Sequence, residues 1–141
     1  MAGIVALLSA VVLTVAVAWV LKVRNGRFSH RTQADAQGLT PADIGTEFGE
    51  RATLVQFSSA FCSPCRATRV LLNDIAAKVD GVVTVDIDAE KHLDLVRRLG
   101  ILRTPTVLVL AADGAVSTRA SGLPRREQVL AALGQAIPDP R

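Results

Sequence analysis

The chain has 141 residues, is 50% hydrophobic and carries a formal net charge of +3, which suits one domain of ordinary size plus one extra segment. Residues 1–31 hold four basic residues and no acidic residue, whereas the remainder holds 12 basic and 13 acidic residues. The near-neutral remainder argues against a nucleic-acid partner, which needs a concentrated basic face, and two cysteines are too few to staple a small secreted domain.

The segment Gly3–Leu21 contains 19 residues without a charge. As a helix it would extend about 28 Å, close to the thickness of the hydrocarbon core of a bilayer. Trp19 suits the water–lipid interface, and Lys22 and Arg24 follow directly. A buried core helix is rarely apolar on all faces over this length, and a cleaved signal peptide needs a basic leading region that is missing here. We therefore expect residues 1–22 to form an uncleaved, single-pass transmembrane anchor.

The positive charges all follow this span, so the positive-inside rule favours a catalytic domain on the cytoplasmic face, with the extracytoplasmic face as the alternative. Residues 23–42 contain few large apolar side chains and several turn formers. They are expected to form a basic and polar linker that acts as a flexible tether. Its basic part either serves only as a topology signal or also contacts anionic lipid head groups. The folded domain is expected over residues 43–138.

Beyond the linker, hydrophobic patterns of strands and helices alternate. Strands are predicted for the apolar or alternating runs Ala52–Ser59, Val82–Asp88 and Thr104–Ala112, with a hairpin partner over 115–121. Helices are predicted over 63–79, 90–100 and 124–137, and the first two bury the stripes Cys65, Thr68, Leu72, Ile75, Val79 and Leu93, Val96, Leu99. Strands separated by helices indicate parallel pairing, and the hairpin adds an antiparallel neighbour.

Both cysteines lie in the stretch "FCSPC", Phe61–Cys65, between the first predicted strand and the following helix. Cys62 therefore occupies a helix N-terminus, where free amides and the helix dipole favour a thiolate and lower its pKa below that of a free cysteine. Pro64 costs no helical hydrogen bond in the first turn. Cys62 is suited to attack a partner disulfide, and the deeper Cys65 to resolve the mixed disulfide.

The cysteine pair has two other interpretations, a zinc site and a structural disulfide. A structural zinc site needs two more ligands, and the chain offers only His30 and His92. A disulfide that only braces the helix end closes too short a loop to stabilise the fold much. We therefore expect no metal and no cofactor. The second notable stretch is Arg103–Pro105, where we predict a cis Thr104–Pro105 peptide bond beside the cysteines.

The stretches "LVQFSSAFCSPC", "VTVDID", "GILRTPTVLVL" and "SGLPRREQVLAAL" resemble the thioredoxin superfamily in order and spacing, over about residues 43–137. The whole chain looks like a membrane-anchored bacterial thioredoxin-like protein. The resemblance implies an α/β fold, with a mixed central sheet that has helices on both faces, preceded here by one transmembrane helix.

The resemblance also implies roles for individual residues. Cys62 corresponds to the nucleophile and Cys65 to the resolving thiol. Pro105 matches the cis-proline of the family, Thr104 the residue whose backbone pairs with an extended substrate, and Gly122 a glycine of the substrate-binding surface. Phe61 and Pro64 complete the expected substrate-binding set.

This sequence departs from the family at several positions near the cysteines. Phe61 replaces the usual tryptophan, and Ser63 replaces a glycine. Gln56 stands where thioredoxins often have a buried aspartate, and Thr84 where they have a lysine. Because an amide does not titrate, these changes weaken the expectation of efficient general reductase activity while leaving thiol–disulfide exchange intact.

Two functions follow from the sequence. The leading hypothesis is a membrane-tethered thiol–disulfide oxidoreductase of the protein-disulfide reductase type. Its expected partners are protein disulfides or dithiols, an electron-donating or electron-accepting redox protein and, through the N-terminal helix, the membrane. The alternative is a thioredoxin-like binding module in which the thiols are not catalytic.

Overall fold

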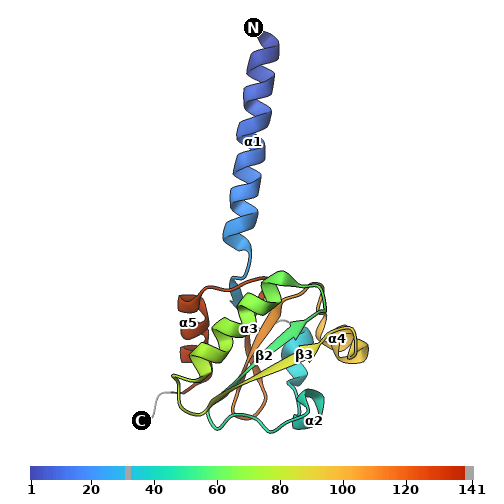
Figure 1. Cartoon of the computed structure of the whole chain (residues 1–141), viewed down its shortest axis with the longest axis vertical. Helices are drawn as coiled ribbons and strands as arrows, with labels where there is room; N and C mark the ends of the chain where they lie inside the picture. Colours follow the sequence, from blue (N-terminus) through green and yellow to red (C-terminus); the bar gives the residue numbers. More distant parts are fainter. Residues whose placement is uncertain (31–32, 139–141) are drawn as a thin grey trace.

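The computed structural model describes residues 1–30 and 33–138. The chain forms a long helix α1 (Ala2–Arg24) that projects from a mixed α/β domain (Figure 1). The described domain contains five strands, β1 (Phe28–His30), β2 (Ala52–Ser58), β3 (Val82–Asp88), β4 (Thr106–Ala111) and β5 (Val116–Ser121). The helices are η1 (Gln33–Gln37, a 3-10 helix), α2 (Pro41–Ile44), α3 (Ser63–Ala76), α4 (Leu93–Leu99) and α5 (Arg126–Ala136).

The strands form one sheet in the order β1-β5-β4-β2-β3. As predicted, β2 and β3 are parallel, since the 14-residue helix α3 carries the chain back across the sheet. The other neighbours are all antiparallel, including β2 and β4. The predicted parallel direction of the two strands that α4 connects, β3 and β4, was wrong. Its seven residues rise only about 10 Å, too little to return along a strand of about 23 Å, so β4 begins at the end of the sheet where β3 finishes.

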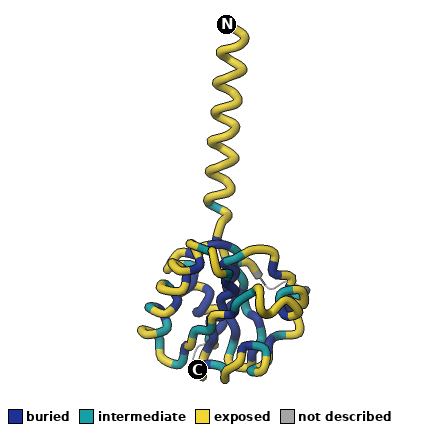
Figure 2. Tube along the Cα trace, turned by 45° about the vertical axis from the view of Figure 1, so that its right-hand side comes forward, coloured by how far each residue is buried: buried dark blue, intermediate teal, exposed yellow. Residues whose placement is uncertain are grey.

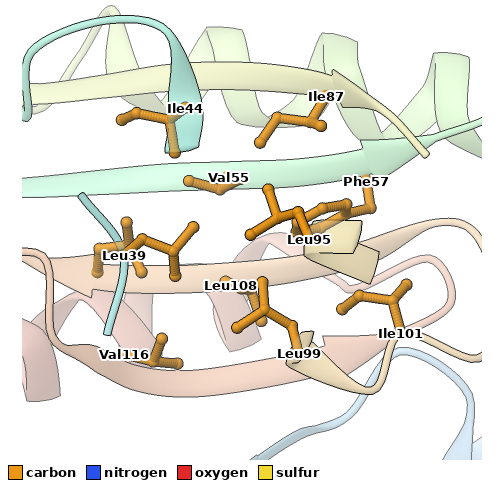
Figure 3. Close-up of a cluster of buried hydrophobic side chains, with 11 residues drawn as sticks. Leu39, Ile44, Val55, Phe57, Ile87, Leu95, Leu99, Ile101, Leu108 and Val116 are labelled. Atoms are coloured by element: carbon orange, nitrogen blue, oxygen red, sulfur yellow. The ribbon is translucent and has the colours of Figure 1, made fainter. Parts of the chain in front are cut away.

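Side chains of the central strands alternate between two apolar cores, one on each face of the sheet. On one face β2 and β4 contribute Leu54 and Val109, which pack with residues of α3 and α5. On the other face Val55 and Leu108 pack with residues of α4 and of the segment around α2 (Figure 3). Both faces are therefore covered by helical segments, as the sequence indicates.

The buried stripe of α3 matches the prediction at Cys65, Thr68, Leu72 and Ile75. In α4 the expected stripe is partly wrong, because Leu93 is 56% exposed while Leu95 and Leu99 are buried. Leu95 lies four residues before Leu99, about 40° away around the helix, whereas Leu93 lies six residues before it, about 120° off that face.

An ion pair network joins α3 to α5 at the surface. Asp74 of α3 accepts hydrogen bonds from Arg126 of α5 and from Lys78, and these bonds, that of Arg126 first, hold the pKa of the Asp74 carboxyl below its usual range. Because all three side chains are at least partly exposed to water, such pairs contribute little to stability. The position of α3 therefore depends mainly on its apolar contacts.

Helix α1 is long and apolar enough to cross a membrane, and none of its side chains is buried in the domain (Figure 2). The segment after it differs from the expected flexible tether. β1 pairs with β5, and Asp35 of η1 is fully buried and forms an ion pair with Arg119 of β5, with Nη2 and Oδ1 3.3 Å apart. Leu39 belongs to the core. Apart from residues 31–32, which lie outside the described part, residues 25–42 are thus packed on the domain.

The packing of α3 gives a test of the fold. Leu72 is 1% exposed, whereas Val70 on the same helix is 70% exposed. Leu72→Ala should lower the free energy of unfolding by about 2–5 kcal/mol through lost contacts and a cavity, and the matched variant Val70→Ala by less than about 0.5 kcal/mol. Urea unfolding of the detergent-solubilised full chain measures both. Equal losses would contradict the described burial of this helix.

Candidate functional site

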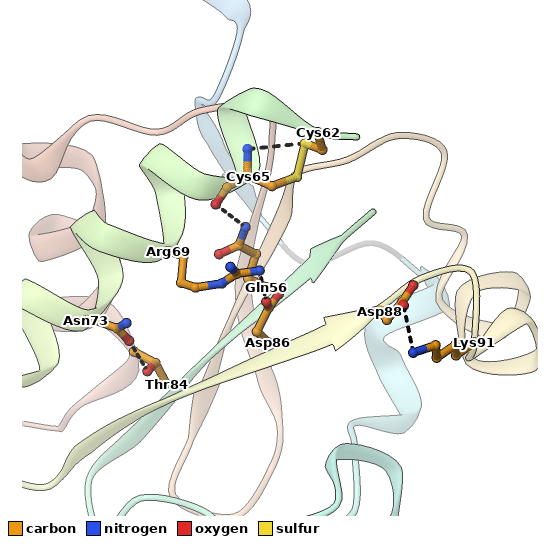
Figure 4. Close-up of polar contacts among 9 residues, drawn as sticks. All are labelled: Gln56, Cys62, Cys65, Arg69, Asn73, Thr84, Asp86, Asp88 and Lys91. Carbon is orange, nitrogen blue, oxygen red and sulfur yellow. Dashed lines mark hydrogen bonds and ion pairs between the residues drawn. A yellow bond between two sulfur atoms is a disulfide. The ribbon is translucent and has the colours of Figure 1, made fainter. Parts of the chain in front are cut away.

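The two cysteines form a disulfide at the N-terminus of α3, with their sulfur atoms 1.98 Å apart. Cys62 is the N-cap residue of the helix, and its Sγ accepts a hydrogen bond from the backbone N–H of Cys65 over 3.2 Å (Figure 4). Pro64 lies in the first turn, where its missing N–H leaves no helical partner unpaired. An amide donor therefore already points at the sulfur that would carry a negative charge after reduction.

The two sulfurs differ in exposure. Cys65 is 1% exposed, while Cys62 is partly exposed at the surface. The neighbouring Phe61 is fully exposed, and Pro64 is exposed as well. An attacking partner can therefore reach the first sulfur of the pair and not the second.

A groove runs beside the disulfide between α3 and the ends of β2 and β3. It is lined by the loop 58–63 together with Arg66, Arg69, Asp86 and Asp88. The guanidinium of Arg69 forms a salt bridge with Asp86 across this groove (Figure 4). Because Asp86 neutralises Arg69, this arginine adds less positive potential at Cys62 than its place in the sequence suggests.

Gln56 lies beneath Cys65 and is itself buried, at 1% exposure. Its Nε2 donates a hydrogen bond of 2.8 Å to the carbonyl oxygen of Cys65, while its Oε1 has no hydrogen-bond partner among the described residues. Thr84 donates a hydrogen bond to Oδ1 of Asn73 on α3 over 2.7 Å. Gln56, Asn73 and Thr84 line a small pocket between α3 and β3. The group under the buried sulfur is thus polar and cannot ionise.

The predicted substrate-binding residues of the later loops come together at the same end of the sheet. The Thr104–Pro105 peptide bond is cis, as predicted. The hydroxyl groups of Thr104 and Ser59 are 3.1 Å apart, which joins this loop to the one that leads into Cys62. The backbone N–H of Gly122 donates to the carbonyl oxygen of Pro105 over 2.7 Å. Thr104, Pro105 and Gly122 therefore form one hydrogen-bonded unit next to the cysteine loop.

Two contacts in this region were not predicted from the sequence. Ser59 connects two loops, whereas the sequence pattern placed it only at the end of the predicted strand Ala52–Ser59. Asn25, placed in the expected tether, accepts a hydrogen bond of 3.1 Å from Arg103. An Asn-Gly pair directly after a helix is a turn signal, but nothing in the local sequence tells what the turn packs against.

Comparison with known proteins identifies the family. A family profile described as thioredoxin matches residues 43–135. The chain belongs to the thioredoxin family. The crystal structure of a chloroplastic thioredoxin z superposes with a TM-score of 0.55 at 27% identity, over 62% of this chain and 79% of that one.

Individual relatives cover different shares of the chain. Thioredoxin Y of Oryza sativa subsp. japonica chloroplasts is 31% identical over 80 residues, which is 56% of this chain and 48% of that protein. Human thioredoxin domain-containing protein 2 is 37% identical over 60 residues, 43% of this chain and 11% of that protein. The thioredoxin of Alicyclobacillus acidocaldarius is 29% identical over 90 residues, 63% of this chain and 85% of that protein. The chain thus spans about half of the rice protein and about a tenth of the human one.

The difference between the two sulfurs leads to a prediction for the reduced protein. Cys62 should react with iodoacetamide much faster than Cys65. As the pH increases, the labelling rate of Cys62 should rise with an apparent pKa below that of a free cysteine, because the first turn of α3 stabilises the thiolate. Mass spectrometry of each labelled peptide over a pH series measures both rates, with Cys65 as the internal control. Faster labelling of Cys65 would contradict the described burial.

Proposed function

We propose that this thioredoxin-family protein is a membrane-tethered thiol–disulfide oxidoreductase that exchanges disulfides with partner proteins through Cys62 and Cys65. The observation that carries the proposal is the disulfide at the N-terminus of α3, with its first sulfur accessible and its second buried. This arrangement suits thiol–disulfide exchange, in which one accessible thiolate attacks and the second releases the captured partner.

In the reducing direction the reaction has two exchange steps. The Cys62 thiolate attacks a partner disulfide, so that a Cys62–partner bond forms, the partner bond breaks and the leaving sulfur departs as a thiolate that takes up a proton. The Cys65 thiolate then attacks the Cys62 sulfur, which forms the internal disulfide and releases the second partner thiolate. Two electrons pass from the dithiol to the partner, and a redox protein that donates electrons restores the dithiol. The same steps reversed oxidise a partner dithiol.

The loops around the cysteines supply a docking surface in this proposal. An extended partner segment lies along the backbone of Thr104 and beside Pro105 and Gly122, while Phe61 and Pro64 contact it from the cysteine side. The hydrogen bond between Gly122 and Pro105 and the one between Thr104 and Ser59 support the assignment, because they hold the loops in register.

We further propose that residues 1–22 anchor the protein and that the thioredoxin-like domain of residues 43–138 faces the cytoplasm. The length and composition of α1 support the anchor, and Lys22, Arg24 and Arg27 directly after the span support this side. The packed segment between them then joins the anchor to the domain.

Trapping tests the proposed exchange. With Cys65→Ser the second step cannot occur, so the reduced full-length protein should form a stable mixed disulfide with a peptide disulfide, and this adduct is detected by mass spectrometry at Cys62. Cys62→Ser should form none, and Val70→Ala on the outer face of α3 should turn over as the unchanged protein does. A Cys65→Ser protein that captures no peptide would favour a binding module with inert thiols.

Gln56 provides a second test, directed at the release step. Gln56→Asp places a carboxylate beneath Cys65 that accepts its proton, and burial raises the pKa of such a carboxyl above its usual range. The rate of the second step should be several-fold higher than in the matched variant Gln56→Asn. The upper bound expected for this gain is about 10²-fold, the lower end of what general-base catalysis contributes. Stopped-flow measurement of mixed-disulfide decay gives the rate, and the gain should vanish below the pKa of the new carboxyl. Equal rates would show that proton transfer from Cys65 does not limit release.

A further inference from the structure

The connection between α1 and the domain is short and fixed. We call residues Asn25–Arg27, between α1 and β1, the elbow. The backbone N–H of Gly26 donates to the carbonyl oxygen of Ser121 over 2.8 Å, and the guanidinium of Arg103 donates to that oxygen over 2.8 Å and to Asn25 Oδ1 over 3.1 Å. The elbow is therefore part of the folded domain, and α1 begins directly beside a segment that is hydrogen-bonded to it.

Gly26 adds a second constraint on the elbow. It is buried and has a φ of +71°, and a Cβ at this position would lie 1.9 Å from the carbonyl oxygen of Leu123. Only glycine accommodates both this backbone angle and this close approach. The direction in which α1 leaves the domain is consequently set by backbone contacts.

The elbow is attached to the loops that surround the disulfide. Arg103, which holds Asn25, directly precedes Thr104, and Thr104 contacts Ser59 three residues before Cys62. On the other side, a Cβ at Gly122 would lie 1.8 Å from Asn25 Oδ1. Cys62 lies at the end of the domain from which α1 departs (Figures 1 and 4). The reacting sulfur and the start of the anchor thus share one end of the molecule.

The length of chain between the apolar span and Gly26 limits how far the disulfide-bearing end of the domain can lie from a bilayer. The apolar span ends at Leu21; three further helical residues add about 4.5 Å and two extended ones about 7 Å to reach Gly26. The head-group layer on one side of a bilayer is roughly 5–8 Å thick. The end of the domain that carries the disulfide is therefore held at the head-group surface.

An apolar rim lies at this same end. Phe61, Leu102 and Leu123 come from three different loops around the disulfide and are 102%, 95% and 39% exposed, respectively. Leu102 directly precedes Arg103, and Leu123 contacts the elbow through its carbonyl group. Large exposed apolar side chains suit contact with another apolar surface, and in the proposed tethered protein these three lie at the level of the lipid boundary.

From the fixed elbow and the height of the site, we propose that the partner is an integral membrane protein, which presents its disulfide or dithiol within a few residues of its own membrane span. The rim then packs on the membrane-proximal surface of that partner while Cys62 reaches its sulfur. This inference rests on the proposed tether and exchange activity, and it narrows the partners to those embedded in the same bilayer.

The test compares probes at two heights. The reduced full-length protein is placed in nanodiscs with a single-span peptide that carries a fluorogenic disulfide either directly after its span or beyond a helical spacer of about 20 residues, which is semi-rigid. The near probe should be reduced about 10-fold faster or more, because its effective concentration at the site is higher. A soluble peptide with the same disulfide reports the exchange activity itself.

A spacer variant serves as the matched control. About 12 Gly/Ser residues inserted between Arg24 and Asn25 form a flexible coil, which frees the domain from the membrane surface. Of the elbow contacts it removes only the hydrogen bond from the Asn25 N–H to the Leu21 carbonyl within α1, and it keeps those with the domain. This insertion should abolish the preference for the near probe, and the same residues appended after Arg141 should preserve it.

Three results would overturn the inference. Equal reduction of near and far probes by the unchanged protein would show that the site is not held at the surface. Slow reduction of both membrane probes in nanodiscs, with fast reduction in detergent, would show that the rim rests on lipid. Failure to reduce even the soluble peptide would overturn the exchange activity itself, and this inference with it.

Discussion

The site depends on the hydrogen bond between the backbone amide of Cys65 and the sulfur of Cys62. This bond places a sulfur where helices usually have a serine, threonine or aspartate oxygen as the N-cap, so the atom that caps α3 is also the atom that reacts. Charge on that sulfur strengthens the cap, and a bond to a partner weakens it. The beginning of the helix is therefore coupled to the redox state, and the buried stripe of α3 holds the helix in place while this happens.

The sequence was sufficient wherever a local pattern decides the structure. The stripe of α3 follows from helical periodicity, the exposure difference between Cys62 and Cys65 from their places in the first turn, and the strands β2 and β3 from short apolar runs. The cis bond before Pro105 was expected because the proline accompanies a C-x-x-C pair, and the structure confirms it. Each of these features depends on residues close together in the chain or on a family pattern.

Features set by distant contacts were missed. Residues 23–42 have no helical or strand periodicity, but β1 needs only three residues, because β5 offers an unpaired edge and Phe28 packs beside the core. The burial of Asp35 depends on Arg119, more than 80 residues later, which no local pattern reveals. Likewise, the orientation of α4 was misjudged because a seven-residue helix has too few positions to define its buried face. The polar composition of this segment did not reveal that it packs on the domain.

The pairing of β1 with β5 and the hydrogen bond from Gly26 to Ser121 attach the segment directly after α1 to the sheet. A helix in a fluid bilayer rotates about its own axis, and a domain attached by a flexible linker would not follow that rotation. In the proposed tethered protein, each rotation of α1 about its axis would carry the dithiol around a circle just outside the lipid. Encounter with another protein then becomes a search in two dimensions, in which the azimuth of the helix decides whether a collision is productive.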